Sequence, residues 1–416
     1  MKHVYVLFII ALLFLAGCTG APATLENVED RIATAVLETG LNTLHIEPLA
    51  DSVPMIRRVT VTGSHRDLGF IEGTVARNAG IPLPLIPDKD RRRNGEIISF
   101  YRELYPQHLE KVGGTAEAYG MALEDVSLEA MERGFYDRFG TEGYDAACTV
   151  GDGFPEEAGS CSVVGISIPD ESGLTPLVGR NLDTYNITGF LVSSRMDGVY
   201  TSVAMSGESL YDYVVDGINE KGLFIGEMSI LDPEYTRANL SREYPEKPSV
   251  YMLRMMRIVL DTCASVEEAV ALFRRVPVWF THDLWHFYLA DSSGARCVIE
   301  YTKDGTVAVV QGSGDYLVST NTPLVEERSV LSLCPRWSVA EKALSGGTVL
   351  TKDDLVRLMG VISVSRRNHW LEQVVPLSYL DTLRTVWTTV YNLQDRTMEL
   401  YHWQDGYTRR EFTVPD

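Results

Sequence analysis

The sequence predicts an α+β domain in which antiparallel strands are layered with a few helices. Short runs of alternating apolar and polar residues lie on either side of a turn, as at 161–168 and 174–182 around Asp170-Glu-Ser-Gly173. This pattern is typical of β-hairpins. Longer stretches at 250–260 and 266–275 repeat apolar residues at helical spacing. Many hairpins with inserted helices favour layered α+β packing.

The same hairpin pattern continues along the chain. Further strand pairs are expected at 211–218 with 223–230, at 287–290 with 295–301, and at 385–393 with 399–403, and a short helix at 355–359. No internal repeat or low-complexity tract interrupts them.

The N-terminal half is expected to be mostly helical. Alternation at 57–63 predicts a strand that ends at a Gly63-Ser64-His65 turn, with a helix after it. Helical spacing over 98–136, interrupted at Gly113-Gly114, predicts two or three amphipathic helices. The Gly-rich, acidic segment 143–160 indicates an exposed loop.

Composition and charge exclude some classes of function. The 416 residues are 45% hydrophobic and 23% charged, which is typical of a globular protein. The net charge of −20 repels nucleic-acid phosphates, so a nucleic-acid-binding protein is not expected. This acidity does not identify a substrate.

The first residues predict export. A polar Lys2-His3 start and the apolar run 4–14 precede a Leu-Ala-Gly-Cys18 ending. That run is shorter than the ~20 residues of a spanning helix. The ending resembles the lipobox of bacterial lipoproteins, which implies cleavage before Cys18 and a membrane-anchoring lipid on its thiol. We therefore expect a signal peptide over 1–18, a polar linker over 19–45, and a cell-envelope lipoprotein outside the cytoplasm; a plain secretory signal or an uncleaved anchor is the alternative.

Cysteine usage indicates a free thiol. After Cys18, the chain contains Cys148, Cys161, Cys263, Cys297 and Cys334. None of them forms a C-x-x-C pair, so no thiolate zinc site of the usual spacing is expected. An odd number in an oxidising compartment leaves at least one thiol unpaired within one chain.

The segment His282-Asp-Leu-Trp-His286 offers a competing interpretation, because it is similar to the H-E-x-x-H motif of zinc peptidases. That motif requires a helix, whereas the aromatic and β-branched neighbours favour a strand. No third ligand is evident. We expect the two histidines to lie on one strand face, and we expect no metal.

Five motifs stand in a distinctive order: a strand-opening Cys161, Gly179-Arg-Asn-Leu-Asp183, Asn219-Glu-Lys-Gly-Leu223, Thr320-Asn-Thr-Pro323 and Ser363-Val-Ser-Arg366. This order resembles the choloylglycine hydrolase and penicillin V acylase family. The long segment before the cysteine, with Gly63-Ser-His-x-x-x-Gly69, is more similar to the related acyl-CoA:6-aminopenicillanate acyltransferases. The resemblance extends over about residues 55–410.

The resemblance implies the fold of the N-terminal nucleophile (Ntn) hydrolases. We expect a four-layer αββα sandwich over 161–416 and a mostly helical pro-segment over 46–160. The expected activity is hydrolysis of a linear amide, with a small N-acyl amine or N-acyl amino acid as substrate and without a cofactor. Whether the protein forms a homo-oligomer stays open.

An N-terminal cysteine combines two catalytic groups in one residue. Amides are poor electrophiles, so their hydrolysis benefits from a covalent intermediate formed by an activated nucleophile. Cleavage between Ser160 and Cys161 would free an α-amine with a pKa of about 7.7–8.0, which suits a general base. The Cys161 thiol would then need no catalytic histidine. Cys148 is a less suitable nucleophile, because it lies too far before Gly179-Arg180 for a tight hairpin.

The resemblance also implies roles for the remaining site residues. Arg180 would lie beside the thiol, Asp183 would accept from the α-amine, and Asn321 would donate to the oxyanion. Arg366 would complete the polar site.

Two positions depart from the related sequences. Ser229 stands where bile-salt hydrolases have a second asparagine, so its role as oxyanion donor is open. Ser160 replaces the glycine that commonly precedes the nucleophile in the self-cleaving branch, so cleavage is open as well.

Two alternatives to a hydrolase stay open. An acyltransferase would pass the acyl group to an amine or thiol instead of water. A lipid-anchored binding protein would have kept the fold without catalysis. Labelling by a thiol-directed acyl-amide probe distinguishes the second from an enzyme.

Overall fold

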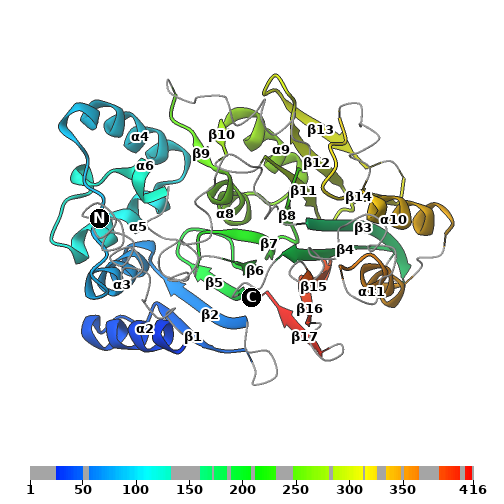
Figure 1. Cartoon of the computed structure of the whole chain (residues 1–416), viewed down its shortest axis with the longest axis horizontal. Helices are drawn as coiled ribbons and strands as arrows, with labels where there is room; N and C mark the ends of the chain where they lie inside the picture. The colour runs from blue at the N-terminus through cyan, green and yellow to red at the C-terminus, as the bar shows by residue number, and fades with distance from the viewer. Residues whose placement is uncertain are drawn as a thin grey trace, which may run out of the picture.

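The computed structural model describes residues 25–49, 56–132, 160–170, 173–184, 189–207, 211–230, 247–280, 284–312, 314–325, 334–347, 351–364, 384–402 and 408–414. Within these ranges, the strands form two large sheets and one small one (Figure 1).

The larger sheet has nine strands among the described residues and is antiparallel except at one pair. In spatial order they are β1 (Leu44–Pro48), β2 (Ile56–Gly63), β5 (Gly189–Met196), β6 (Ser202–Ser206), β7 (Val214–Asn219), β8 (Phe224–Ser229), β11 (Trp285–Ala290), β12 (Arg296–Tyr301) and β13 (Val307–Gln311).

The second sheet has six strands in the described part of the chain, all antiparallel. Their order is β14 (Tyr316–Ser319), β3 (Ser160–Asp170), β4 (Gly173–Thr184), β15 (Arg384–Asn392), β16 (Thr397–His402) and β17 (Thr408–Thr413). The short strands β9 (Val250–Tyr251) and β10 (Val278–Trp279) pair in parallel.

In chain order, the described helices lie before and between the strands. They are α2 (Leu25–Thr39), α3 (His65–Asn78), α4 (Arg91–Leu104), α5 (Pro106–Ala118), α6 (Leu128–Ala130), α8 (Met252–Thr262), α9 (Val266–Arg275), α10 (Pro335–Ser345) and α11 (Lys352–Val361), with 3₁₀ turns η1 (Asp88–Asp90) and η2 (Leu123–Asp125).

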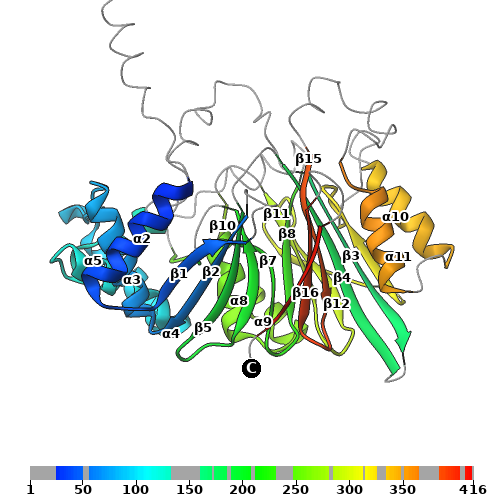
Figure 2. The same cartoon turned by 90° about the horizontal axis from the view of Figure 1, so that it is seen from below.

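The two large sheets pack face to face, and helices cover their outer faces. Between the sheets, Cys161 and Val163 of β3 share one apolar cluster with Phe224 of β8 and Tyr288 of β11. Helices α10 and α11 cover the outer face of the six-stranded sheet, as the edge-on view of Figure 2 shows. The predicted four-layer αββα arrangement of Ntn hydrolases is confirmed.

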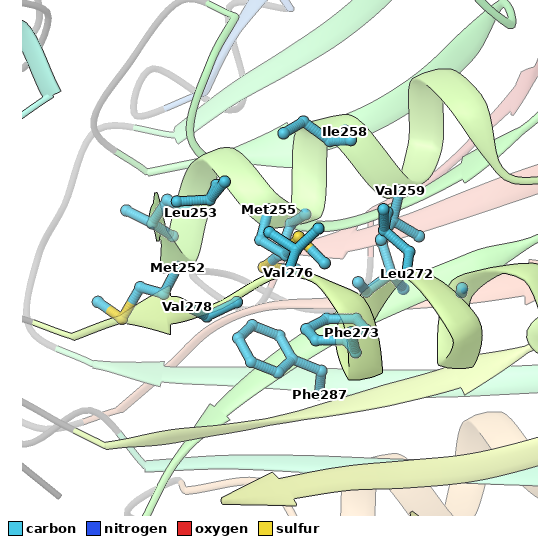
Figure 3. Packing of buried hydrophobic residues seen from close by; sticks show 14 of the residues in the cluster. Met252, Leu253, Met255, Ile258, Val259, Leu272, Phe273, Val276, Val278 and Phe287 are labelled. Atoms are coloured by element: carbon cyan, nitrogen blue, oxygen red, sulfur yellow. The ribbon is translucent and has the colours of Figure 1, made fainter. Parts of the chain in front are cut away.

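Helices α8 and α9 cover the outer face of the nine-stranded sheet. Figure 3 shows Met255 and Val259 of α8 lying near Phe273 of α9 and Phe287 of β11. The Phe273 and Phe287 ring centroids are 4.9 Å apart. Removing this apolar surface from water stabilises the layer by about 25 cal/mol per Å².

The predicted hairpins and the helices after residue 250 are present as strands β3–β4, β7–β8, β11–β12 and β15–β16 and helices α8, α9 and α11. Strand β17 extends the last hairpin to a three-stranded unit. Among the described residues, no helix is both long and apolar enough to span a bilayer.

The N-terminal segment is part of the same body. Strand β2 pairs in parallel with β5 over the full length from Ile56 to Gly63, so this segment extends the larger sheet by β1 and β2. The expected pro-segment is therefore helical with a two-stranded sheet extension. Strand 57–63 and the helix after it are as predicted.

The predicted helix break at Gly113-Gly114 is wrong. Helix α5 runs through both glycines, and the chain breaks instead at Tyr105, before Pro106. A Cβ atom on Gly114 would lie 2.0 Å from the Arg66 backbone oxygen of α3, and one on Gly69 would lie 1.9 Å from a backbone oxygen of α5. These glycines allow two helix backbones to touch, which helix propensity alone does not reveal.

Part of the range expected as a linker over 19–45 is folded. Residues 25–39 form α2, whose Ile32 and Ala35 are buried against α3 and β1. Acidic and apolar residues recur in this range at helical spacing, but its overall polar composition is that of a linker.

Buried ion pairs tie the N-terminal segment to the sheets. The Lys111 ammonium contacts the carboxylates of Glu72 (2.8 Å) and Asp212. Arg254 of α8 donates to Glu132 at 3.1 Å. Since breaking a buried pair leaves an uncompensated charge, these contacts oppose separation of the two parts.

Candidate active site

Cys161 lies at the start of β3 and is 2% exposed. In the β3–β4 hairpin, Cys161 is opposite Leu182, and Ser160 is opposite Asp183. Because neighbouring strand residues point to opposite faces, Cys161 and Arg180 share the face toward the larger sheet. Asp183 points to the other face, toward α10.

Arg180 connects the nucleophile candidate to two acids of the larger sheet. Its guanidinium Nη2 lies 3.6 Å from Cys161 Sγ and donates to Glu227 Oε1 at 2.7 Å. Its Nη1 is 2.9 Å from Asp216 Oδ2. All of these side chains are buried. The two carboxylates raise the pKa of Arg180 against the effect of burial, so it is a fixed cation.

The thiol of the uncut chain is neutral at ordinary pH. Burial raises the pKa of Cys161 to about 12, the Glu227 carboxylate also raises it, and Arg180 offsets only part of these effects. A thiolate is the reactive form, so this thiol is a weak nucleophile without a base that takes its proton, even though Arg180 lies beside it.

Asn321 lies just after β14 and contacts the backbone of the same cysteine. Its amide Oδ1 accepts from the Cys161 backbone N–H at 2.8 Å, and its Nδ2 donates to the Ser229 backbone oxygen at 2.7 Å. An amide nitrogen has two hydrogens, so the bond from Nδ2 to Ser229 is compatible with donation from the same nitrogen to an oxyanion. The backbone of Ser229 therefore belongs to the site.

Arg336 of α10 links Asp183 to Asn321. Its Nη1 donates to Asp183 Oδ2, and its Nη2 donates to Asn321 Oδ1 at 2.6 Å. The other oxygen of Asp183 accepts from Thr385. Burial raises the pKa of the Asp183 carboxyl above its usual range, although Arg336 lowers it. This arginine thereby fixes two of the expected site residues at once.

The Arg336 Nε donates to Cys334 Sγ at 3.2 Å. Although burial opposes it, this guanidinium lowers the pKa of the Cys334 thiol. Within the described residues, no group of three or more His, Cys, Asp or Glu side chains is arranged to hold a metal ion.

Comparison with known proteins assigns the family. The sequence model of the acyl-coenzyme A:6-aminopenicillanic acid acyl-transferase family matches residues 171–406. The chain belongs to this family. The matched range begins inside the β3–β4 hairpin and includes Arg180, Asp183, Ser229 and Asn321.

Relatives of this acyl-transferase family member include a penicillin V acylase from Pectobacterium atrosepticum, which is 30% identical over 175 residues. That match covers 40% of this chain and 44% of the relative, so the chain spans less than half of the length of this relative.

This acyl-transferase family member is also similar to solved structures, among them a penicillin V acylase from Agrobacterium tumefaciens. The TM-score is 0.45 and the identity 17%, and the match covers 61% of this chain and 86% of that one. Another is a mutant of a conjugated bile acid hydrolase from Clostridium perfringens, with a TM-score of 0.45, 14% identity, and coverage of 61% and 92%.

The structure brings together Cys161, Arg180, Asp183, Asn321 and the Ser229 backbone. The Cys161 backbone N–H donates to Asn321 and not to Asp183, whose carboxylate accepts from Arg336 and Thr385. Ser229 contributes a backbone oxygen that accepts from Asn321, not the expected donor. Other predicted positions lie outside the described residues: Arg366, Cys18, Cys148 and His282. Ser160 is placed by its backbone, opposite Asp183. The roles of the individual residues stay predictions.

Sequence reasoning missed Arg336, Glu227 and Asp216. The two acids lie in the mainly apolar, buried strands β7 and β8, and a charged residue in such a strand is a usable signal of a buried pair. Arg336 follows a Cys-Pro step at the start of α10, a position that has no local link to the nucleophile 175 residues earlier. Only the folded chain brings it to Asp183.

Proposed function

We propose that this protein is an exported, lipid-anchored hydrolase of linear amides, in which Cys161 is the nucleophile and becomes an N-terminal residue by self-cleavage. One observation supports this most strongly. The Cys161 sulfur lies beside Arg180, while its backbone nitrogen is bonded to Asn321, so both groups of an N-terminal cysteine point into polar contacts.

The cleavage step uses the same sulfur. Cys161 Sγ adds to the Ser160 carbonyl carbon, the peptide C–N bond breaks, and the thiol proton passes to the departing nitrogen. Water then opens the thioester, which leaves a carboxyl group on Ser160 and restores the thiol. The new α-amine has an acceptor in place, because Asn321 Oδ1 already lies 2.8 Å from that nitrogen.

Cleavage supplies what the uncut site lacks. The α-amine of Cys161 takes the thiol proton, and the thiolate attacks the acyl carbon of the substrate. The substrate C–N bond breaks as the ammonium returns the proton to the leaving amine. Water then hydrolyses the acyl-cysteine, with the amine again as base.

The surrounding side chains stabilise this chemistry electrostatically. Arg180 favours the thiolate, and the Arg336–Asp183 pair holds the end of β4 and Asn321 near the amine. Asn321 donates to the oxyanion, a contact typically worth about 2.7–4 kcal/mol in the transition state. Ser229 and Arg366 are proposed as further polar partners of the substrate.

The substrate is proposed to be a small N-acyl amine or N-acyl amino acid. The relative named a penicillin V acylase makes penicillin V a suitable first probe. Its hydrolysis releases a free amine, which is measured without a label. The protein would meet its substrate outside the cytoplasm, held to a membrane by a lipid on Cys18.

The two pieces of the cleaved chain are expected to stay together. The β2–β5 pairing and the buried Lys111–Asp212 and Arg254–Glu132 pairs join residues on either side of the cleavage point. They bury charge that separation would leave unpaired.

Intact mass and N-terminal sequencing of the purified protein test this proposal. Wild type should give two co-purifying pieces, one of which begins at Cys161, and should release amine from penicillin V. Cys161→Ala should remain one inactive chain, while Cys263→Ala, which removes a buried cysteine outside the site, should be cut and active. A single uncut chain that hydrolyses N-acyl amides would contradict the mechanism.

The family assignment favours acyl transfer as a second candidate, because its model describes an acyl-transferase. Both reactions share the acyl-cysteine and differ in the group that opens it. Product analysis with and without an added amine acceptor separates them. A hydrolase releases free acid with water alone, whereas a transferase forms the new amide and turns over slowly without an acceptor.

A further inference from the structure

His286 and Glu300 form a buried acid–base pair that the proposed chemistry does not use. They lie on the adjacent strands β11 and β12 of the larger sheet, and the side chains of both are 0% exposed. His286 Nδ1 is 2.9 Å from Glu300 Oε1. His286 ends the segment that is similar to a zinc-peptidase motif, but here it is a strand residue.

The pair holds the backbone on both sides of Asn321. His286 Nε2 lies 2.7 Å from the Thr320 carbonyl oxygen, one residue before Asn321. Glu300 Oε1 accepts from the Leu324 N–H at 2.7 Å, and its Oε2 accepts from the Val325 N–H at 3.0 Å. We call residues 320–325 the Asn321 loop.

These contacts fix the protons of the pair. A carbonyl oxygen only accepts, so Nε2 must donate to Thr320. Glu300 accepts from two backbone N–H groups, and one further proton lies between Glu300 and Nδ1. Both ring nitrogens of His286 therefore face oxygen atoms, which leaves neither of them directed at a metal ion. Buried polar groups paired in this way are costly to disrupt.

We propose that His286 and Glu300 are positioning residues that set the place of Asn321 relative to the nucleophile. The contacts form a continuous path: the pair binds the Asn321 loop, and Asn321 Oδ1 binds the Cys161 nitrogen at 2.8 Å. This proposal rests on the proposed function, because the path ends at the amine and oxyanion of the amidase reaction. Neither residue touches the reacting atoms.

The distances explain why a small loop shift matters. A misplacement of about 1 Å in a catalytic group can lower the rate on the order of 10²-fold. Glu300→Gln replaces one accepting oxygen by an NH₂ group. In either orientation of the amide, this NH₂ group faces a backbone N–H that donates to Glu300 in the wild type, and two donors cannot bond to each other. The Asn321 loop then has to move or lose a bond.

The experiment compares Glu300→Gln with Glu399→Gln, each alone and in an Asn321→Ala background. Glu399 is a matched control, since it is a buried carboxylate that accepts from Lys352 and Tyr401, outside the site. The rate of amine release from penicillin V gives kcat and KM, thermal unfolding gives Tm, and iodoacetamide labelling of the Cys161 peptide, read by mass spectrometry, counts the accessible nucleophile.

Glu300→Gln should lower kcat by about 10-fold or more with little change in KM. In the Asn321→Ala background the same change should have less than about a twofold further effect, because its path runs through Asn321. Glu399→Gln should lower Tm while kcat stays at the value of the parent chain in each background.

His286 provides a second test should Glu300→Gln not fold. His286→Gln keeps an N–H donor for Thr320, whereas His286→Leu keeps none, so kcat should fall in the order wild type, Gln, Leu. A folded Glu300→Gln or His286→Leu with wild-type kcat would overturn the positioning role. Wild type that hydrolyses neither penicillin V nor other N-acyl amides would instead overturn the proposed function itself.

Discussion

Replacing Arg336 by glutamine tests the charge balance of the site. The side chain of Arg336 is 4% exposed and that of Asp183 is 0% exposed, and the two are directly paired. Arg336 also donates to Asn321. Glutamine keeps a polar group of moderate size but removes the positive charge, so the Asp183 carboxylate keeps Thr385 as a hydrogen-bond donor and loses its cation.

The expected loss is large. Breaking a buried ion pair by removing one partner typically lowers the free energy of unfolding by about 3–5 kcal/mol. That is a considerable part of the roughly 5–15 kcal/mol by which folded proteins are stable. An exposed pair behaves differently, because water solvates the remaining charge.

The loss should depend on pH in a defined direction. Burial already raises the pKa of Asp183, and removing Arg336 takes away a group that lowers it. A carboxyl with a higher pKa in the folded state binds its proton more tightly there, so stability falls as pH rises between the unfolded and folded pKa values. The destabilisation by Arg336→Gln should therefore be largest near neutral pH and smaller in acid.

Urea unfolding in a Cys161→Ala background measures this on chains of identical length. The urea midpoint of the chain with Arg336 is compared with that of Arg336→Gln, at about pH 7.5 and at about pH 5. Arg357→Gln is the control: it removes an exposed partner of Asp354 and should change stability little. A loss below about 1 kcal/mol at neutral pH, or one that grows as pH falls, would refute the reasoning.

Two further predictions concern packing and thiol reactivity. Gly69→Ala should lower the free energy of unfolding by about 1–3 kcal/mol, seen as a lower urea midpoint, because its Cβ would lie 1.9 Å from the Lys111 backbone oxygen. Gly113→Ala is the control, because a Cβ there has no neighbour nearer than 4.0 Å and should not lower the midpoint. Equal midpoints for the two variants would contradict the close helix contact. In freshly made uncut chain at about pH 8, iodoacetamide should alkylate Cys334 before Cys161, since burial raises the pKa of Cys161 to about 12 and Arg336 lowers that of Cys334. Peptide mass spectrometry follows both thiols, and equally fast labelling before cleavage would be inconsistent with this order.

The hairpin that carries the nucleophile was predictable because its signals are local. Alternation over 161–168 and 174–182 and the turn residues between them specify two paired strands without reference to the rest of the chain. Pairing then brings Cys161 near Arg180, since the two positions lie on one face of adjacent strands. This part of the candidate site follows from sequence alone.

Local signals failed where two distant backbones meet. Gly113-Gly114 predicts a helix break, yet α5 continues through it because α3 packs against Gly114. Residues 25–39 have the composition of a linker and nevertheless form α2, whose Ile32 and Ala35 find an apolar surface on α3 and β1. In both cases tertiary packing outweighs intrinsic propensity.

The sequence by itself determined strand β2, the hairpins β3–β4, β7–β8, β11–β12 and β15–β16, most helices, the order of the motifs and the choice of Cys161 as the candidate nucleophile, because periodicity, turn residues and motif spacing act over short distances. Tertiary structure alone decided that Arg336 pairs with Asp183 and that His286 and Glu300 hold the Asn321 loop. These charged groups come from separate strands and helices, and burial makes each depend on partners that no local pattern specifies.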